Sequence, residues 1–102
     1  MFYDHFTPFC LLNLEAYGFL PFGEAKDFVN GGENIRFDGM LPINTHGGNH
    51  SEAYIHGLTH VQEAVRLIRG TSTSQPPKKT INRVLSCSSV AQLSAAVVIR
   101  RG

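Results

Sequence analysis

The residues best suited to chemistry lie together in the segment 44–57, which reads Asn-Thr-His-Gly-Gly-Asn-His-Ser-Glu-Ala-Tyr-Ile-His-Gly. The segment holds histidines, a carboxylate and a tyrosine around a pair of glycines, Gly47 and Gly48. Such glycines let backbone N–H groups come close to a ligand, and a helix that begins after them favours negative charge there. We therefore expect the functional site of this chain in this segment.

A long helix predicted over Ser51–Arg69 would position these side chains. Apolar residues recur along it at spacings of four and three and form one stripe. The members of this stripe are Tyr54, Leu58, Val61, Val65 and Ile68. Asn49 or Ser51 can cap the N-terminus of the helix, and Gly70 ends it. Beside the stripe, His60 is expected to face solvent.

A shorter helix is predicted near the N-terminus. Thr7 can cap it, Pro8 suits its first turn, and Gly18 ends it. The helix is apolar nearly all round, and such a helix normally lies between two layers. In a chain of this length we expect one of its sides to lack a cover.

The remaining segments predict short elements. One helical turn is expected over Glu24–Val29, and a short strand over Met40–Ile43. The β-branched run Ala95–Ile99 predicts a buried strand, with Arg83–Cys87 as its partner. A helix over Ser89–Ala96 is the weaker alternative. Helices and strands in this order predict a layered α/β fold.

Composition limits the classes of function. The chain has 102 residues, 42% of them hydrophobic and 17% charged, with a net charge of +1. This length predicts one domain, 1–102, and this charge gives no field that would attract nucleic acid. The basic pairs Lys78-Lys79 and Arg100-Arg101 read as loop and terminal charges. No apolar run reaches the roughly 20 residues that span a membrane.

The two cysteines indicate a reducing compartment. Cys10 and Cys87 form no Cys-x-x-Cys pair, and each lies in an apolar run, where a free thiol is an ordinary buried group. The first residues also lack the pattern of a signal peptide. We therefore expect a cytoplasmic protein.

A zinc site is the competing interpretation of the histidines. The residues that would form it are His46, His50, Glu52, His56 and His60. Two of them, His56 and His60, are four residues apart on the predicted helix. The His-Glu-x-x-His order of zinc hydrolases is missing. We predict no metal site and keep a zinc-binding helical module as an alternative.

The pattern Asn44-x-x-Gly47-Gly48, followed by Gly57 and a long helix, resembles the C-terminal half of the thiolase superfamily, in its lipid-transfer or sterol-carrier branch. In that register Tyr54 replaces a catalytic histidine of the family. Tyr3 replaces the asparagine of the family's Asn-Glu-Ala-Phe segment. These two replacements make the chain most similar to thiolase-like aldolases of bacterial steroid side-chain breakdown.

The resemblance extends over the whole chain and implies its fold and its activity. The fold would be a partial thiolase-like layer structure, a mixed sheet packed by helices, and an incomplete C-terminal half. The activity would be retro-aldol cleavage of an acyl-CoA, or acyl transfer, in lipid or steroid breakdown. Acyl-CoA would be the substrate, and no further cofactor is implied.

The resemblance also implies roles for individual residues. Tyr54 and Tyr3 would carry the proton transfers, since a phenol can act as acid or base when its pKa moves from about 10 toward neutrality. A helix N-terminus and nearby imidazoles would move it in that direction. The supporting or oxyanion-binding residues would be Asn44, His46, Gly47, Gly48, His5 and His56.

Two departures from the family carry further expectations. Cys87 occupies the place of a catalytic cysteine, but the following residues, Ser88–Ser94, lack the family's glycines, so we expect a buried thiol. The N-terminal half of the family is missing, so the chain reads as a truncation. The isolated chain should then be inactive and pair with a thiolase N-terminal half, a second copy, or a small OB-fold subunit. The alternative is a non-catalytic fragment that pairs with the missing half.

Overall fold

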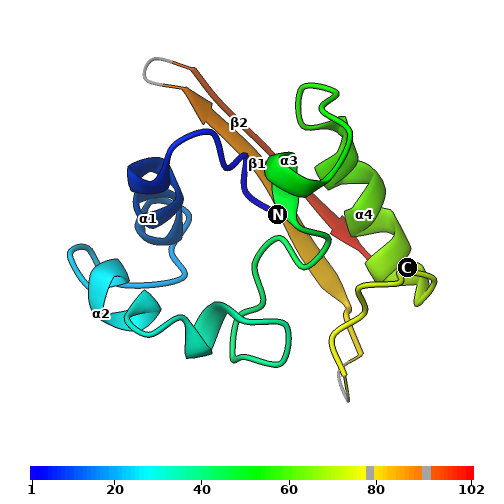
Figure 1. Ribbon diagram of the computed structural model, residues 1–102, viewed down its shortest axis with the longest axis horizontal. Helices are drawn as coiled ribbons and strands as arrows, with labels where there is room; N and C mark the ends of the chain where they lie inside the picture. The colour runs from blue at the N-terminus through cyan, green and yellow to red at the C-terminus, as the bar shows by residue number, and fades with distance from the viewer. Residues whose placement is uncertain (78–79, 91–92) are drawn as a thin grey trace.

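A β-hairpin separates the helices of this small α/β fold into two groups (Figure 1). The structure is a computed structural model that describes residues 1–77, 80–90 and 93–102. Its helices and strands are α1 Thr7–Ala16, α2 Ala25–Val29, the short 3₁₀ helix Glu33–Ile35, α3 Gly48–Ser51, α4 Leu58–Arg69, β1 Arg83–Val90 and β2 Leu93–Arg100. In Figure 1, α1 and α2 lie on one side of the hairpin and α4 lies on the other. This arrangement confirms the predicted α/β class.

The hairpin is antiparallel and has apolar residues on both faces. Ala95–Ile99 forms the predicted strand, but the prediction that this strand is buried is wrong. Residues 95–98 are exposed and Ile99 is only half-buried, because β2 is the outer strand of the hairpin. Val84 pairs with Ile99, and both contact a cluster that includes Ala64 and Leu67 of α4. The next residue, Leu85, packs on the other face against a cluster that includes Phe2 of the N-terminal segment and Leu14 of α1. Successive side chains of a strand point to opposite faces, which gives each group of helices its own half of the core.

The N-terminal segment extends this sheet on the other edge of β1. Phe2 forms a parallel bridge with Cys87. The N–H of Tyr3 donates to the carbonyl of Cys87, and the N–H of Cys87 donates to that of Met1, both at 2.9 Å. Parallel pairing on one edge and antiparallel pairing on the other make the mixed arrangement that the resemblance implies.

The helix predicted over Ser51–Arg69 is interrupted, and that prediction is wrong for its first third. α3 ends at Ser51, an irregular loop occupies residues 52–57, and α4 begins at Leu58. His56 and Gly57 have φ values of 44° and 80°, in the left-handed region that a right-handed helix cannot contain. Gly57 is the N-cap of α4, so neither Asn49 nor Ser51 caps it.

The buried face of α4 differs from the predicted stripe. It consists of Thr59, His60, Glu63, Ala64, Leu67 and Ile68. Leu58 is exposed, whereas His60, which we expected in solvent, is only 1% exposed. Polar residues occupy this face because the chain supplies partners for them. Ser72 donates to the Glu63 carboxylate, and Asp4 lies beside His60.

α1 agrees with its prediction, apart from its cap. It begins at Thr7, but Phe6 is the N-cap residue and no side chain caps the helix. Leu14 is 1% exposed in the core, whereas Leu12, on another side of the helix, is 49% exposed. One side of this apolar helix is therefore uncovered, as expected.

Two predicted elements are absent from the described chain, and one is present. The helical turn at Glu24–Val29 is α2. Residues 40–43 form no strand, because the N–H groups of Leu41 and Ile43 donate to carbonyls around the 3₁₀ helix instead of to a sheet. Residues 89–90 and 93–96 lie in strands, so the alternative helix over Ser89–Ala96 is wrong. Lys78-Lys79 and Ala91-Gln92 lie outside the described residues.

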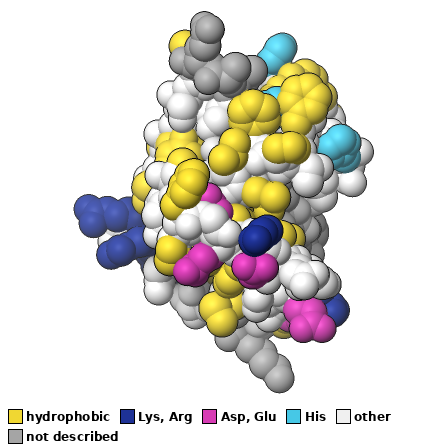
Figure 2. Space-filling model, turned by 90° about the vertical axis from the view of Figure 1, so that its left-hand side faces the viewer, with side chains coloured by type: hydrophobic (Ala, Val, Ile, Leu, Met, Phe, Trp, Pro, Cys, Tyr) yellow, Lys and Arg dark blue, Asp and Glu magenta, His cyan; other side chains and the backbone are white. Residues whose placement is uncertain are grey.

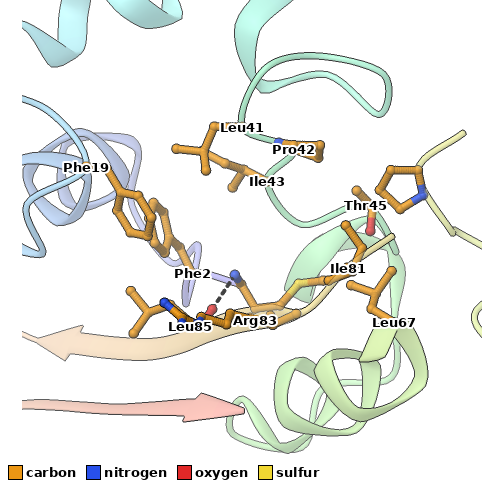
Figure 3. A pocket seen from close by; sticks show the side chains of 13 residues that line it. Phe2, Phe19, Leu41, Pro42, Ile43, Thr45, Leu67, Ile81, Arg83 and Leu85 are labelled. Atoms are coloured by element: carbon orange, nitrogen blue, oxygen red, sulfur yellow. Dashed lines mark hydrogen bonds between the residues drawn. The ribbon is translucent and has the colours of Figure 1, made fainter. Parts of the chain in front are cut away.

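An apolar cavity of about 110 Å³ lies between the N-terminal segment, residues 41–43 and β1 (Figure 3). Phe2, Phe19 and Ile43 line one side of it, and Arg83 is the one titratable side chain among the described residues that line it. None of its lining residues belongs to segment 44–57 except Thr45. This cavity therefore has few groups that could do chemistry. Within the described ranges, no helix is long and apolar enough to cross a membrane.

Candidate active site

The structure brings Tyr3 and Tyr54 together. Their hydroxyl groups form a hydrogen bond, and the centroids of their rings are 6.3 Å apart. Tyr3 lies on the segment beside β1, and Tyr54 lies on the loop 52–57 between α3 and α4. Tyr54 is 56% exposed, so the pair is open at the surface of this chain. Two phenols in direct contact can exchange a proton with each other and with a bound molecule.

Several contacts hold Tyr3. Besides the bond from its N–H to Cys87, its carbonyl accepts a hydrogen bond from Nδ1 of His5 at 2.9 Å. Gly57 gives room to its ring, because a Cβ at residue 57 would lie 3.0 Å from Cδ2 of Tyr3. The backbone and the ring of Tyr3 are therefore both fixed.

Aromatic and imidazole rings continue on either side of the pair. Nδ1 of His56 lies 3.4 Å from the hydroxyl of Tyr54. The ring of His5 lies 5.2 Å from that of Tyr3 and stacks on Phe9 at 4.9 Å. The two predicted neighbours, His5 and His56, thus flank the pair, one on each tyrosine.

The rim of this site is apolar and exposed. Its large exposed side chains are Phe6, Ile55 and Leu58. Figure 2, which shows the α1 and α2 side of the molecule, has hydrophobic side chains near histidines at its upper edge. An apolar rim around two phenols is suited to a substrate that is apolar next to the group that reacts.

A cavity of about 250 Å³ lies between α4 and the hairpin beside the pair. Its lining includes Tyr3, His56 and His60 together with Cys87. Burial raises the pKa of the Cys87 thiol to about 11. Because the thiolate is the nucleophile, Cys87 is an inert thiol at neutral pH, which agrees with the sequence prediction.

The pKa of Tyr3 is raised above its ordinary value, chiefly by the hydrogen bond with Tyr54 and then by burial. This is the opposite of the direction that we expected for the pair from nearby imidazoles. Burial lowers the pKa values of His46 and His60 from 6.5, so both rings are neutral at pH 7 and supply no positive charge. Tyr3 therefore keeps its proton at neutral pH.

Two of the predicted oxyanion-binding residues, Asn44 and Gly47, already make hydrogen bonds within the chain. The side-chain oxygen of Asn44 accepts the N–H of Phe2 and its nitrogen donates to the carbonyl of Phe2, both at 2.8 Å. The N–H of Gly47 donates to the carbonyl of Asn44 at 2.8 Å. Gly47 and Gly48 have positive φ and lead into α3, not into the long helix. Their role toward an oxyanion stays a prediction.

His46 does not contact the tyrosine pair directly but packs against His60, whose ring lies next to that of Tyr3. Its ring meets that of His60 edge to face at 5.1 Å, and neither of its nitrogens has a hydrogen-bond partner among the described residues. The residues proposed for zinc do not converge. Within residues 1–77, 80–90 and 93–102, no three His, Cys, Asp or Glu side chains are grouped to hold a metal ion.

The sequence assigned no site role to Asp4 and wrongly placed His60 in solvent. Asp4 contacts both α3 and α4, and His60 is buried beneath Tyr3, with the two rings 6.3 Å apart. The spacing of His60, Glu63, Ala64 and Leu67 fits a second helical stripe, and this signal could have indicated the burial of His60. Asp4 gives no such signal, because its contacts are distant in sequence.

The sequence matches the profile of the family described as "Thiolase C-terminal domain-like" over residues 1–101. It is 60% identical over 74 residues to the "Steroid side-chain-cleaving aldolase" of Thermomonospora curvata, which covers 72% of this chain and 19% of that protein. It is 58% identical over 72 residues to the "17-hydroxy-3-oxo-4-pregnene-20-carboxyl-CoA lyase" of Mycobacterium tuberculosis, which covers 71% of this chain and 18% of that protein.

A solved structure is also similar. The "Ltp2-ChsH2(DUF35) aldolase" superimposes with a TM-score of 0.83 and 47% sequence identity over 97% of this chain and 25% of that one. The chain thus spans about a fifth of the length of the curated relatives and a quarter of the solved chain. The similarity of fold therefore extends over nearly all of the present residues.

Proposed function

This chain belongs to the thiolase C-terminal domain-like family, and on this premise we propose that it supplies the tyrosine pair of an acyl-CoA aldolase. The proposed substrate is a β-hydroxyacyl-CoA with a large apolar group, such as a steroid side chain, and the reaction is a retro-aldol cleavage. The names of the two curated relatives, an aldolase and a CoA lyase, support this class of reaction.

The single observation that carries the proposal is the contact between the hydroxyl groups of Tyr3 and Tyr54. In a retro-aldol cleavage, a base removes the proton of the β-hydroxyl group and the oxygen forms a carbonyl. The bond between the α and β carbons breaks, and its electrons form the enolate of the thioester. An acid then protonates the α carbon. The products are a ketone and a shorter acyl-CoA, and no cofactor is consumed.

The direction of the pKa shift of Tyr3 supports an assignment of the two steps. Tyr3 holds its proton more strongly than an ordinary phenol and is the proposed acid. Tyr54, whose hydroxyl group forms a hydrogen bond with that of Tyr3, is the proposed base. Each general acid or base of this kind contributes about 10²- to 10⁴-fold to a rate.

Partners complete the proposed enzyme. β2 is exposed along most of its length, with Val97 at 45% and Val98 at 61% exposed on opposite faces. A thiolase N-terminal half, or a second copy of the chain, would cover this surface. A small OB-fold subunit is a further proposed partner, supported by the two components in the name of the similar aldolase. The reduced thiols of Cys10 and Cys87 suit a cytoplasmic location.

The test is turnover by the chain co-expressed with a thiolase N-terminal half. Cleavage of a β-hydroxyacyl-CoA is followed by mass spectrometry of both products. Tyr3→Phe and Tyr54→Phe should each lower the rate about 10²-fold or more. Tyr17→Phe is the matched control, since Tyr17 bonds to Ser94, away from the pair.

Full activity of the Tyr3→Phe and Tyr54→Phe assemblies would exclude the proposed roles. A stable assembly that turns over no acyl-CoA would favour a non-catalytic subunit instead.

A further inference from the structure

The carboxylate of Asp4 links the two segments that carry the tyrosine pair. Asp4 directly follows Tyr3 in the sequence. Its Oδ1 accepts the N–H of Asn49 in α3 at 3.0 Å and lies 3.4 Å from Nε2 of His60 in α4. α3 and α4 are the helices before and after the loop 52–57, which carries Tyr54. One carboxylate therefore contacts both helices that flank that loop.

The glycine at residue 48 makes this approach possible. A Cβ at Gly48 would overlap Oδ2 of Asp4 and would lie 3.1 Å from Nδ2 of Asn44. The side chains of Asp4 and His60 are 17% and 2% exposed, so water competes little for the contact. The bond to Asn49 is the stronger of the two contacts, because 3.4 Å exceeds an ordinary N–H···O distance.

Asn44 fixes the residue on the other side of Tyr3. Its two hydrogen bonds hold both the N–H and the carbonyl of Phe2. Tyr3 thus lies between two residues that are each attached to the segment 44–49. The position of its hydroxyl relative to the loop 52–57 depends on these attachments.

We propose that Asp4 is a positioning residue that sets the contact between the hydroxyl groups of Tyr3 and Tyr54. Asp4 does not touch the hydroxyls and acts through the backbone on either side of them. The importance of this contact for catalysis rests on the proposed function. The geometry itself does not, because it can be measured without turnover. A displacement of about 1 Å in a catalytic group can cost 10²-fold in rate.

The experiment is the phenol titration of the chain labelled with ¹³Cζ-tyrosine. In the wild type, Tyr3 should titrate above the ordinary phenol value and show a nuclear Overhauser effect to Tyr54. In Asp4→Ala, the pKa of Tyr3 should fall toward the ordinary value and the Overhauser effect should weaken. Asp4→Asn keeps an oxygen for the N–H of Asn49 and should retain both signals.

Two glycine variants keep the negative charge of Asp4 in place. Gly48→Ala displaces the carboxylate and should behave like Asp4→Ala. If Asp4→Ala does not fold, the titration of Tyr3 in Gly48→Ala tests the proposal in its place. Gly70→Ala is its matched control. Gly70 has a similar φ, 72° against 67°, but nothing lies within 4 Å of the added Cβ.

Two results would overturn the proposal. The first is an unchanged titration of Tyr3 in Asp4→Ala and Gly48→Ala. The second is the same loss in Asp4→Asn as in Asp4→Ala, which would mean that charge, and not position, controls Tyr3. In the assembled enzyme, Asp4→Ala should lower kcat about 10- to 100-fold with little change in KM. Because the titration needs no substrate, failure of the aldolase proposal leaves this result standing.

Discussion

The ring of Tyr3 occupies the space that a side chain at Gly57 would need. A Cβ at residue 57 would lie 3.0 Å from Cδ2 and 3.4 Å from Cε2 of that ring. Gly57 is also the N-cap of α4 and has a φ of 80°. A single glycine thus ends the loop that carries Tyr54 and makes room for Tyr3.

Gly57→Ala is expected to affect stability and the tyrosine pair together. The left-handed backbone costs about 1 kcal/mol for a residue with a side chain, and the contact with Tyr3 adds to this cost. Urea unfolding should show a loss of about 1–3 kcal/mol. Gly18→Ala, with a φ of 76° and open space around it, should lose only the backbone part. Equal losses in both variants would contradict a packing role for Gly57.

Low pH should destabilise the chain through its buried histidines. Burial lowers the folded-state pKa of His60 and of His46 below the ordinary 6.5, so the unfolded state binds protons more strongly. Their contribution to stability is therefore present above about pH 6.5 and is lost as the pH falls toward the folded-state pKa. Unfolding free energies at pH 7.5, 6.5 and 5.5 should decrease in that order.

His60→Gln is the variant that tests the source of this slope. It should flatten the pH dependence, because it removes a buried imidazole. A slope that persists in His60→Gln and in His46→Gln would assign the effect to other groups.

The two thiols should differ in reactivity. Cys87 is buried and has a pKa of about 11, so roughly one molecule in 10⁴ carries its thiolate at pH 7. Iodoacetamide should therefore label the partly exposed Cys10 before Cys87, and should label both in urea. Mass spectrometry of tryptic peptides measures this order. Rapid labelling of Cys87 in the folded chain would reopen a nucleophilic role for it.

The contribution of α1 to the unfolding free energy should come from the one face of the helix that is buried. Leu14→Ala removes a side chain that is 1% exposed and should cost about 2–5 kcal/mol in unfolding free energy. Leu12→Ala removes a leucine of the same helix that is 49% exposed and should cost less than about 1 kcal/mol. Comparable losses in isolated chains would mean that α1 is covered on both sides. In an assembly with a partner, the cost of Leu12→Ala should rise.

Local sequence patterns correctly predicted the elements in which neighbouring residues all favour the same secondary structure. The β-branched run Ala95–Ile99 and its partner form the hairpin, and Gly70 ends α4 as expected. The predicted start of the long helix was wrong because the apolar spacing continues through Tyr54. The backbone of His56 and Gly57 is left-handed, and this conformation ends the helical path there. Hydrophobic periodicity shows which side chains are apolar, but it does not show which residues adopt a left-handed backbone conformation.

The site itself was predictable only through the resemblance to thiolases. Nothing in the spacing of Tyr3 and Tyr54 indicates that residues 51 positions apart will touch. The burial of His60 and the contacts of Asp4 could not be predicted for the same reason. Each depends on a partner that the folded backbone brings from a distant segment.

The outer strand of the hairpin has a consequence for handling the chain. Among the described strands, β2 pairs only with β1, so its second row of backbone N–H and carbonyl groups is open beside exposed valines. A strand of this kind is a template for the same strand of another molecule. Concentrated preparations should therefore gel or precipitate unless a companion polypeptide is synthesised with them.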